Sequence, residues 1–126
     1  MDARETGRAS NPDVAVVDIW TFRTEPPLRA TDLVGFSVEA TDGGIGKIDE
    51  GTEETGRSHL VVDTGPWIFG KKVMLPAGVV DRVDMDTETV FVNRSKDEIK
   101  AAPEFVEANR GDEDYQNRLG RYYGGL

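Results

Sequence analysis

The stretch Leu33-Val-Gly-Phe-Ser-Val-Glu-Ala-Thr-Asp-Gly-Gly-Ile-Gly-Lys-Ile-Asp-Glu50 decides the fold of this chain. Phe36, Val38 and Ala40 alternate with polar residues, which is the period of a half-buried β-strand. The Asp-Gly pair in the middle supplies the positive φ of a tight hairpin turn, and a return strand follows it. Gly46 lies inside that return strand, where a bulge or a close backbone contact is expected.

Further apolar segments follow at intervals of roughly ten residues, separated by turn residues. They predict strands at 59–63, 72–76, 79–85 and 89–93. With the two strands of the hairpin, this gives a mainly β fold, a small six-stranded β-barrel. Closure of the barrel would remove exposed sheet edges.

Short helical segments flank the predicted barrel. Ser95-Lys-Asp-Glu98 has the form of a capping box, and the helix that it starts should stop before Pro103. Residues 112–123 predict a second short helix with its apolar residues on one side. These apolar residues are Tyr115, Leu119 and Tyr122 or Tyr123.

The N-terminal part has a different character. Residues 1–12 are polar and without periodicity, which predicts a disordered tail. Residues 13–23 suit a helix or a strand, with the helix favoured, and Trp20 and Phe22 should dock on the barrel. The predicted domain limits are a clasp segment at 13–28, a barrel at 29–105 and a C-terminal tail with a short helix at 106–126.

The hairpin resembles the opening of a PRC-barrel domain. Three later motifs continue that family's pattern in order, namely Leu60-Val-Val-Asp-Thr-Gly65, Phe69-Gly-Lys-Lys-Val-Met-Leu-Pro76 and Lys96-Asp-Glu-Ile-Lys-Ala-Ala-Pro103. The chain resembles stand-alone, actinobacterial-type members. Related members are the cytoplasmic domain of the reaction-centre H subunit and the C-terminal domain of RimM-type ribosome-maturation factors. The resemblance implies a barrel that works by binding, and neither specific role is transferred.

Composition narrows the classes of function. The net charge is −9, from 24 acidic and 15 basic residues, and Lys71-Lys72 is the one adjacent basic pair. Direct nucleic-acid binding is disfavoured, because proteins that bind phosphates present clustered lysine and arginine. There is no cysteine, no apolar signal-peptide core and no run long enough to span a membrane. We therefore expect a cytoplasmic protein.

The sequence contains only weak signals for a catalytic site or a metal-binding site. His59 is the sole histidine of the sequence, and it is expected to be a surface or strand-end residue. The acidic clusters at 49–54 and 84–88 do not have the spacing of a calcium loop, and solvated turns explain them better. Gly43-Gly-Ile-Gly46 joins two strands and precedes no helix, unlike a phosphate-binding loop. We expect no cofactor, no metal and no enzymatic activity.

The stretch Gly65-Pro-Trp-Ile-Phe-Gly70 places large apolar side chains in a loop between two glycines. Two interpretations remain open: Trp67 and Phe69 close the barrel mouth, or at least one of them contacts a partner. Lys71 and Lys72 flank the loop, where they would steer an acidic partner or solvate the strand edge. The candidate partner-binding residues are therefore Trp67, Phe69, Lys71 and Lys72.

The first functional hypothesis is a non-enzymatic PRC-barrel adaptor that binds a protein or a second copy of itself. The second is a ribosome-assembly or RNA-processing accessory that acts through protein contacts, since ribosomal proteins are often basic. The third is a barrel that binds a small ligand or a metal.

Overall fold

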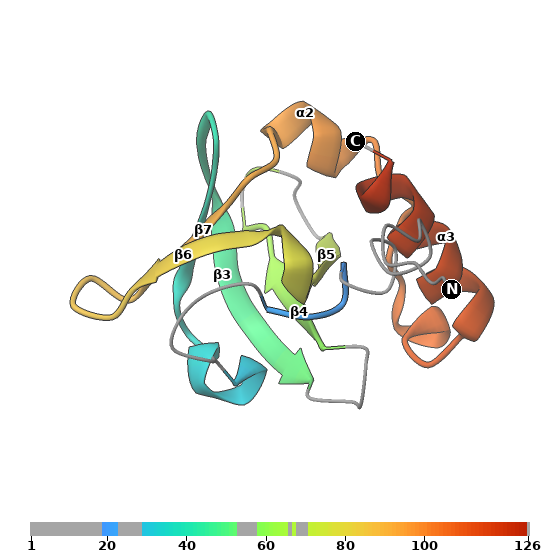
Figure 1. The fold of residues 1–126 in the computed structure, drawn as a ribbon, viewed down its shortest axis with the longest axis horizontal. Coiled ribbons are helices and arrows are strands. Elements are labelled where there is room, and N and C mark those ends of the chain that lie inside the picture. The colour runs from blue at the N-terminus through green and yellow to red at the C-terminus, as the bar shows by residue number, and fades with distance from the viewer. Residues whose placement is uncertain (1–18, 23–28, 53–57, 66, 68–70, 126) are drawn as a thin grey trace, which may run out of the picture.

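The computed structural model describes residues 19–22, 29–52, 58–65, 67 and 71–125. Within these residues, six strands form one mixed sheet in the order β5-β4-β3-β2-β7-β6 (Figure 1). This agrees with the predicted mainly β class. The strands are β2 (Ser37–Ala40), β3 (Gly43–Thr52), β4 (His59–Asp63), β5 (Lys72–Pro76), β6 (Val80–Asp84) and β7 (Thr89–Val92).

The β2–β3 hairpin forms as predicted. Ala40 pairs with Gly43, so Thr41 and Asp42 make the turn, and Gly43 has a φ of 142°. The register shifts by one residue after Val38, which is a β-bulge. Gly46 at this bulge has a φ of 148° and lies so close to β4 that a Cβ would clash with its backbone. The expected bulge and close backbone contact are both confirmed.

The sheet curls but is not closed by hydrogen bonds, because β5 and β6 are its two edges. A 3-10 turn, η2 (Ala77–Val79), connects β5 to β6. Val79, the first residue of the strand expected at 79–85, belongs to this turn, so β6 begins one residue later. The Gly78 N–H donates to the Ile19 carbonyl at 2.7 Å, and the Ser58 N–H donates to the Trp20 carbonyl at 3.0 Å. The curled sheet is consistent with the predicted small β-barrel, but the expected closure by hydrogen bonds between its edges does not form within the described residues.

The N-terminal segment contributes side chains to the core. Trp20 is 5% exposed, and Phe22 packs partly buried against the core. Docking of these two side chains is confirmed. Ile19 and Trp20 lie in a turn, so the favoured helix does not extend to them, and residues 13–18 lie outside the described residues.

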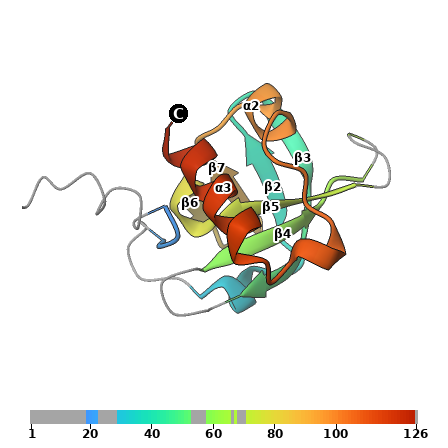
Figure 2. The ribbon, with the colours of Figure 1, turned by 90° about the vertical axis from the view of Figure 1, so that its right-hand side faces the viewer.

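Two α-helices follow the strands, α2 (Lys96–Lys100) and α3 (Glu113–Gly124). A short 3-10 turn, η1 (Ala30–Leu33), precedes β2, and another, η3 (Glu107–Asn109), lies between the two helices. The capping box is confirmed: the Ser95 Oγ accepts from the Glu98 N–H, and the Glu98 carboxylate accepts from the Ser95 N–H. Asp112 caps α3. Figure 2 shows α3 alongside β5 and β4.

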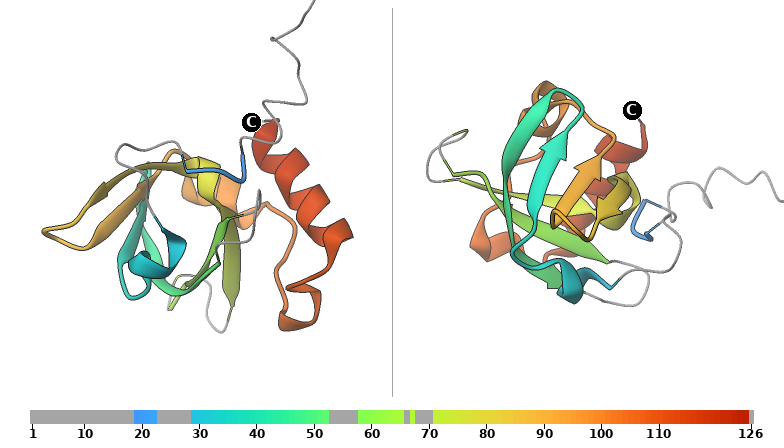
Figure 3. Two further views of the ribbon diagram at one scale, coloured as in Figure 1. Left: turned by 60° about the horizontal axis from the view of Figure 1, so that its bottom comes forward. Right: turned by 90° about the vertical axis from the view of Figure 1, so that its left-hand side faces the viewer.

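The C-terminal helix shares the core of the sheet. Tyr115, Leu119 and Tyr123 are each at most 1% exposed and belong to the same buried cluster as the strand residues. The β6–β7 hairpin extends on the side of the molecule away from α3 (Figure 3). The limits of the clasp, the barrel and the C-terminal tail stay a prediction. The structure shows in addition that α3, in the predicted tail, packs on the sheet. Among the described residues, every helix is too short or too polar to span a membrane.

Candidate functional site

The predicted contact residues lie in different parts of the structure. Trp67 is half-buried and packs against the hydrophobic core, with the Lys96 Nζ 5.5 Å from the centre of its ring. Its backbone N–H donates to the Thr64 carbonyl at 3.1 Å. Phe69 lies outside the described residues. Partner binding by Trp67 and Phe69 therefore stays a prediction.

The two adjacent lysines each form an ion pair with a distant residue. The Lys71 Nζ lies 2.5 Å from a carboxylate oxygen of Glu104, and the Lys72 Nζ lies 2.7 Å from one of Asp49. The hydrogen bond to Asp49 raises the pKa of Lys72. All four side chains are 40–58% exposed, so solvent screens both pairs.

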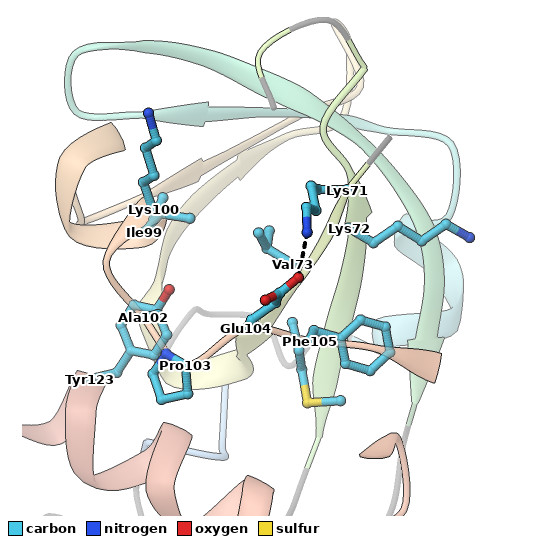
Figure 4. Close-up of a pocket in the computed structure, with 11 residues that line it drawn as sticks. Lys71, Lys72, Val73, Ile99, Lys100, Ala102, Pro103, Glu104, Phe105 and Tyr123 are labelled. Atoms are coloured by element: carbon cyan, nitrogen blue, oxygen red, sulfur yellow. Dashed lines mark hydrogen bonds and ion pairs between the residues drawn. The ribbon is translucent and has the colours of Figure 1, made fainter. Parts of the chain in front are cut away.

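A cavity of about 230 Å³ lies between β5 and the chain segment that leaves α2 (Figure 4). Its walls are mostly apolar and are formed by Val73, Met74, Ile99, Ala102, Pro103 and Phe105. Its charged lining residues are Lys71, Lys72, Lys100 and Glu104. Figure 4 shows the Lys71–Glu104 pair reaching across the cavity from opposite sides.

The wall opposite β5 is held in place by α3. Pro103 cannot continue α2, so the chain leaves the helix in an extended form. The Tyr115 hydroxyl donates to the Pro103 carbonyl at 3.2 Å, and the Tyr122 hydroxyl donates to the Glu98 carbonyl at 2.5 Å. Phe105 is 5% exposed, and its ring centre lies 6.1 Å from that of Tyr115.

Tyr123 supplies a polar group to this mostly apolar cavity. Its side chain is fully buried, and its hydroxyl has no hydrogen-bond partner within the described residues. Burial raises the pKa of Tyr123, so the hydroxyl keeps its proton and can donate. An Arg94 guanidinium nitrogen donates to the Tyr123 carbonyl at 2.8 Å, which fixes the backbone there.

Lys71 and Lys72 were among the contact residues predicted from the sequence. Ile99, Ala102 and Tyr123, which also line the cavity, were not. The capping box and Pro103 predicted where α2 begins and where it ends, and so where the segment after it starts. Its position against β5 depends on contacts across at least 25 residues of sequence, for which the hydrophobic pattern gives no signal.

His59 is a core residue. It begins β4, so of the two expected positions, surface or strand end, the strand end is the one observed, and the side chain is 2% exposed. Its ring centre lies 6.3 Å from that of Trp20, edge to face. The N-terminal segment covers this end of β4, and His59 does not line the cavity.

Each acidic cluster contains carboxylates that have protein partners, namely Asp49 and Glu50 in the first and Asp84 in the second. The Glu50 carboxylate accepts two hydrogen bonds from Arg110, each at 2.7 Å. Asp84 accepts from the backbone N–H of Thr87 at 3.2 Å, and this bond is the main reason that the pKa of Asp84 is lowered. Residues 53 and 54 lie outside the described residues. In the described part of the chain, no group of three or more histidine or acidic side chains is arranged to hold a metal ion.

A second hollow, of about 460 Å³, lies beside the β2–β3 hairpin. It is more open than the cavity at β5, and Gly44, Gly46 and Gly65 contribute to its lining. It includes none of the predicted contact residues, so the cavity at β5 is the candidate site.

No family model and no curated protein matches this chain. Among solved structures, it is similar to a candidate 16S ribosomal RNA processing protein, RimM, from Pseudomonas aeruginosa, with 24% sequence identity and a TM-score of 0.48. The similarity covers 60% of this chain and 49% of that protein, so the chain spans about half of its length.

Proposed function

We propose that this chain is a non-enzymatic binding module of the PRC-barrel type that engages a protein partner through the cavity beside β5. The observation that carries the proposal is the cavity itself: apolar walls, lysines among its lining residues, and a position at an edge of the sheet. An apolar anchor surrounded by polar groups is the usual anatomy of a protein–protein contact.

The size of the cavity favours a protein partner over a free small molecule. Pockets for drug-sized ligands usually measure about 300–1,000 Å³. The cavity at β5 measures about 230 Å³, which suits a single large side chain presented by another protein. The small-ligand alternative would use the same cavity.

Three further features support a binding role without catalysis or direct contact with nucleic acid, and we place this role in the cytoplasm as part of the proposal. His59 is buried among core residues and does not line the cavity. The cavity's carboxylate, Glu104, is paired with Lys71 at its mouth. The net charge of −9 disfavours direct contact with nucleic acid. The ribosome-assembly alternative would therefore require contacts with proteins.

A pair of neighbouring alanines allows a controlled test. Ala102 lines the cavity and is partly buried, whereas Ala101 is exposed and does not line it. Ala102→Leu should fill part of the cavity, and Ala101→Leu adds the same side chain beside it. Each variant, with wild type, is used to capture proteins from native lysate, and the captured proteins are quantified by mass spectrometry.

We expect wild type and Ala101→Leu to capture the same partner and Ala102→Leu to lose it. Circular dichroism and the midpoint of thermal unfolding check that the variants fold. If Ala102→Leu does not fold, Val73→Leu fills the cavity from β5 instead. Equal capture by a folded cavity-filling variant and by Ala101→Leu would contradict the proposal. Sedimentation velocity of the same samples tests whether the partner is a second copy of the chain.

A further inference from the structure

We infer that the partner binds as an extended acidic peptide segment that adds a strand to the free edge of β5 and places a carboxylate on the Tyr123 hydroxyl. This inference rests on the proposed function and specifies the chemistry of the partner. The backbone of β5, the charge around the cavity and the buried hydroxyl of Tyr123 support it independently.

The register of β5 shows which of its backbone groups face outward. The Thr64 N–H donates to the Lys71 carbonyl, and the Ala77 N–H donates to the Ser58 carbonyl. Hydrogen-bonded and non-hydrogen-bonded pairs alternate in an antiparallel ladder, so with the observed register residues 73 and 75 bond to β4. The N–H and C=O groups of Lys72 and Met74 therefore point away from β4.

Within the described residues no strand pairs with this edge of β5, and the edge is partly exposed at one end. Lys72 and Val73 are partly exposed, whereas Met74, Leu75 and Pro76 are buried. Pro76 is the next outward-facing position after Met74, and it has no N–H to offer. An added strand therefore pairs along Lys72–Met74, beside the cavity. Main-chain bonds to a sheet edge, with a pocket for a side chain, are a recurring mode of peptide recognition.

The charge around the cavity selects an acidic peptide. Lys71, Lys72 and Lys100 line the cavity with one carboxylate, Glu104, in a protein with a net charge of −9, and Lys72 is itself paired with Asp49 outside the lining. Lys100 makes no ion pair within the described residues. The Lys71–Glu104 pair is exposed on both sides, so it is weak and a carboxylate of the peptide can replace Glu104.

Tyr123 defines the group that enters the cavity. Its hydroxyl is buried, lacks a partner within the described residues and belongs to a residue that lines the cavity. A buried hydroxyl without a partner loses free energy relative to a hydrogen-bonded one, so an acceptor from the ligand is favoured there. A carboxylate satisfies the hydroxyl and is attracted by the neighbouring lysines at the same time.

The test uses a fluorescein-labelled peptide, acetyl-Glu-Val-Glu-Phe-Glu-Val-Glu-amide, and fluorescence anisotropy with the full chain. Two further versions carry N-methyl groups on the odd-numbered or on the even-numbered residues. In an added strand only alternate N–H groups face β5, so one methylated version should lose binding at least about tenfold and the other should keep it. A version with lysine in place of every glutamate should not bind.

The protein variants test the side chains. Tyr123→Phe should weaken binding of the acidic peptide about tenfold, and Lys100→Gln up to about fivefold. Glu104→Gln, which releases Lys71, should strengthen it. Arg82→Gln on β6, at the opposite edge of the sheet, removes the same charge as Lys100→Gln and should have no effect. Equal binding of both methylated versions, or of the lysine peptide, would overturn the inference.

The inference and the proposed function can fail separately. If no acidic peptide binds but Ala102→Leu still loses a captured partner, the inference is wrong and the proposed function stands. If sedimentation shows a dimer that Ala102→Leu abolishes, the occupant is a second copy, and the inference is likewise overturned. If Ala102→Leu loses nothing and no peptide binds, both are wrong.

Discussion

At Gly46 the backbone leaves room for a hydrogen atom and no more. A Cβ at this position would lie 2.0 Å from the Asp63 carbonyl oxygen, and the φ of +148° is one that side chains rarely adopt. A glycine inside an alternating strand was enough to predict the close contact. The atom that it contacts belongs to β4, and the local pattern could not identify it.

Gly46→Ala should lower the free energy of unfolding by at least about 2 kcal/mol, because backbone strain and a clash with backbone atoms act together. Gly65→Ala is the matched control, since Gly65 also has a positive φ but an added Cβ meets nothing within 4 Å. It should cost about 1 kcal/mol. Urea denaturation followed by tryptophan fluorescence measures both. Equal losses would show that the contact with β4 contributes nothing.

The two buried tyrosines should respond oppositely to loss of the hydroxyl. Tyr115→Phe removes a hydrogen bond to the Pro103 carbonyl and should cost about 1 kcal/mol. The Tyr123 hydroxyl has no such bond within the described residues, so Tyr123→Phe should leave the free energy of unfolding unchanged or raise it. Stability that is kept while peptide binding falls would mark Tyr123 as a binding residue. A loss from Tyr123→Phe as large as that from Tyr115→Phe would contradict this.

Among the elements, α3 packs through its apolar residues and also through a glycine, Gly120. The apolar spacing predicted the helix and its buried residues correctly, since both follow from a local period. Gly120, in the middle of the helix, faces Trp20, and a Cβ there would lie 2.9 Å from the indole nitrogen. This contact could not be predicted from local pattern, because the two residues are 100 positions apart.

Glycine-to-alanine substitutions in α3 test how tightly the N-terminal segment packs. Gly124→Ala enters open space and should be neutral or stabilise by up to about 1 kcal/mol, the gain from better helix propensity. Gly120→Ala should instead destabilise, because the indole of Trp20 must move. Thermal unfolding compares the two variants. Stabilisation by Gly120→Ala equal to that by Gly124→Ala would mean that Trp20 does not pack on α3.

The strands and the capping box were predictable from the sequence. That β5 and β6 would remain two separate edges of the sheet was not predictable. Strand bounds at 59–63 and 72–76 agree with the prediction residue for residue, since alternation and turn residues fix them locally. The backbone N–H groups of Gly78 and Ser58, at the ends of the segments next to β5 and β4, bond to the N-terminal segment. Such long-range bonds leave no periodic pattern in the sequence.

At the scale of the whole molecule, the buried tyrosines make stability depend on alkaline pH. Burial raises the pKa of Tyr115 and Tyr123 above the ordinary value of about 10. A raised folded-state pKa means that this stability is fully present below pH 10 and is lost as pH rises beyond it. Each tyrosine should then contribute a decline of up to about 1.4 kcal/mol per pH unit.

Urea denaturation at half-unit steps from pH 8 to 11.5 measures this decline. The double variant Tyr115→Phe/Tyr123→Phe should show a much flatter profile above pH 10, because its core holds neither titrating hydroxyl. An identical decline in the double variant would assign the alkaline loss to other groups.

The candidate site draws on segments that are distant in sequence, which is why only part of it could be predicted. Lys71 and Lys72 were identified because they are adjacent, basic and next to an aromatic loop. Glu104 and Tyr123 join them through the packing of α3 against β5, and this packing is a property of the folded chain.

Amide hydrogen exchange of the wild-type chain, alone and saturated with the captured partner, shows where the partner binds. Binding in the cavity beside β5 should slow exchange in 71–75 and 99–105 and leave the β6–β7 hairpin unchanged. Protection confined to the hairpin or to the β2–β3 turn, with 71–75 unchanged, would contradict it.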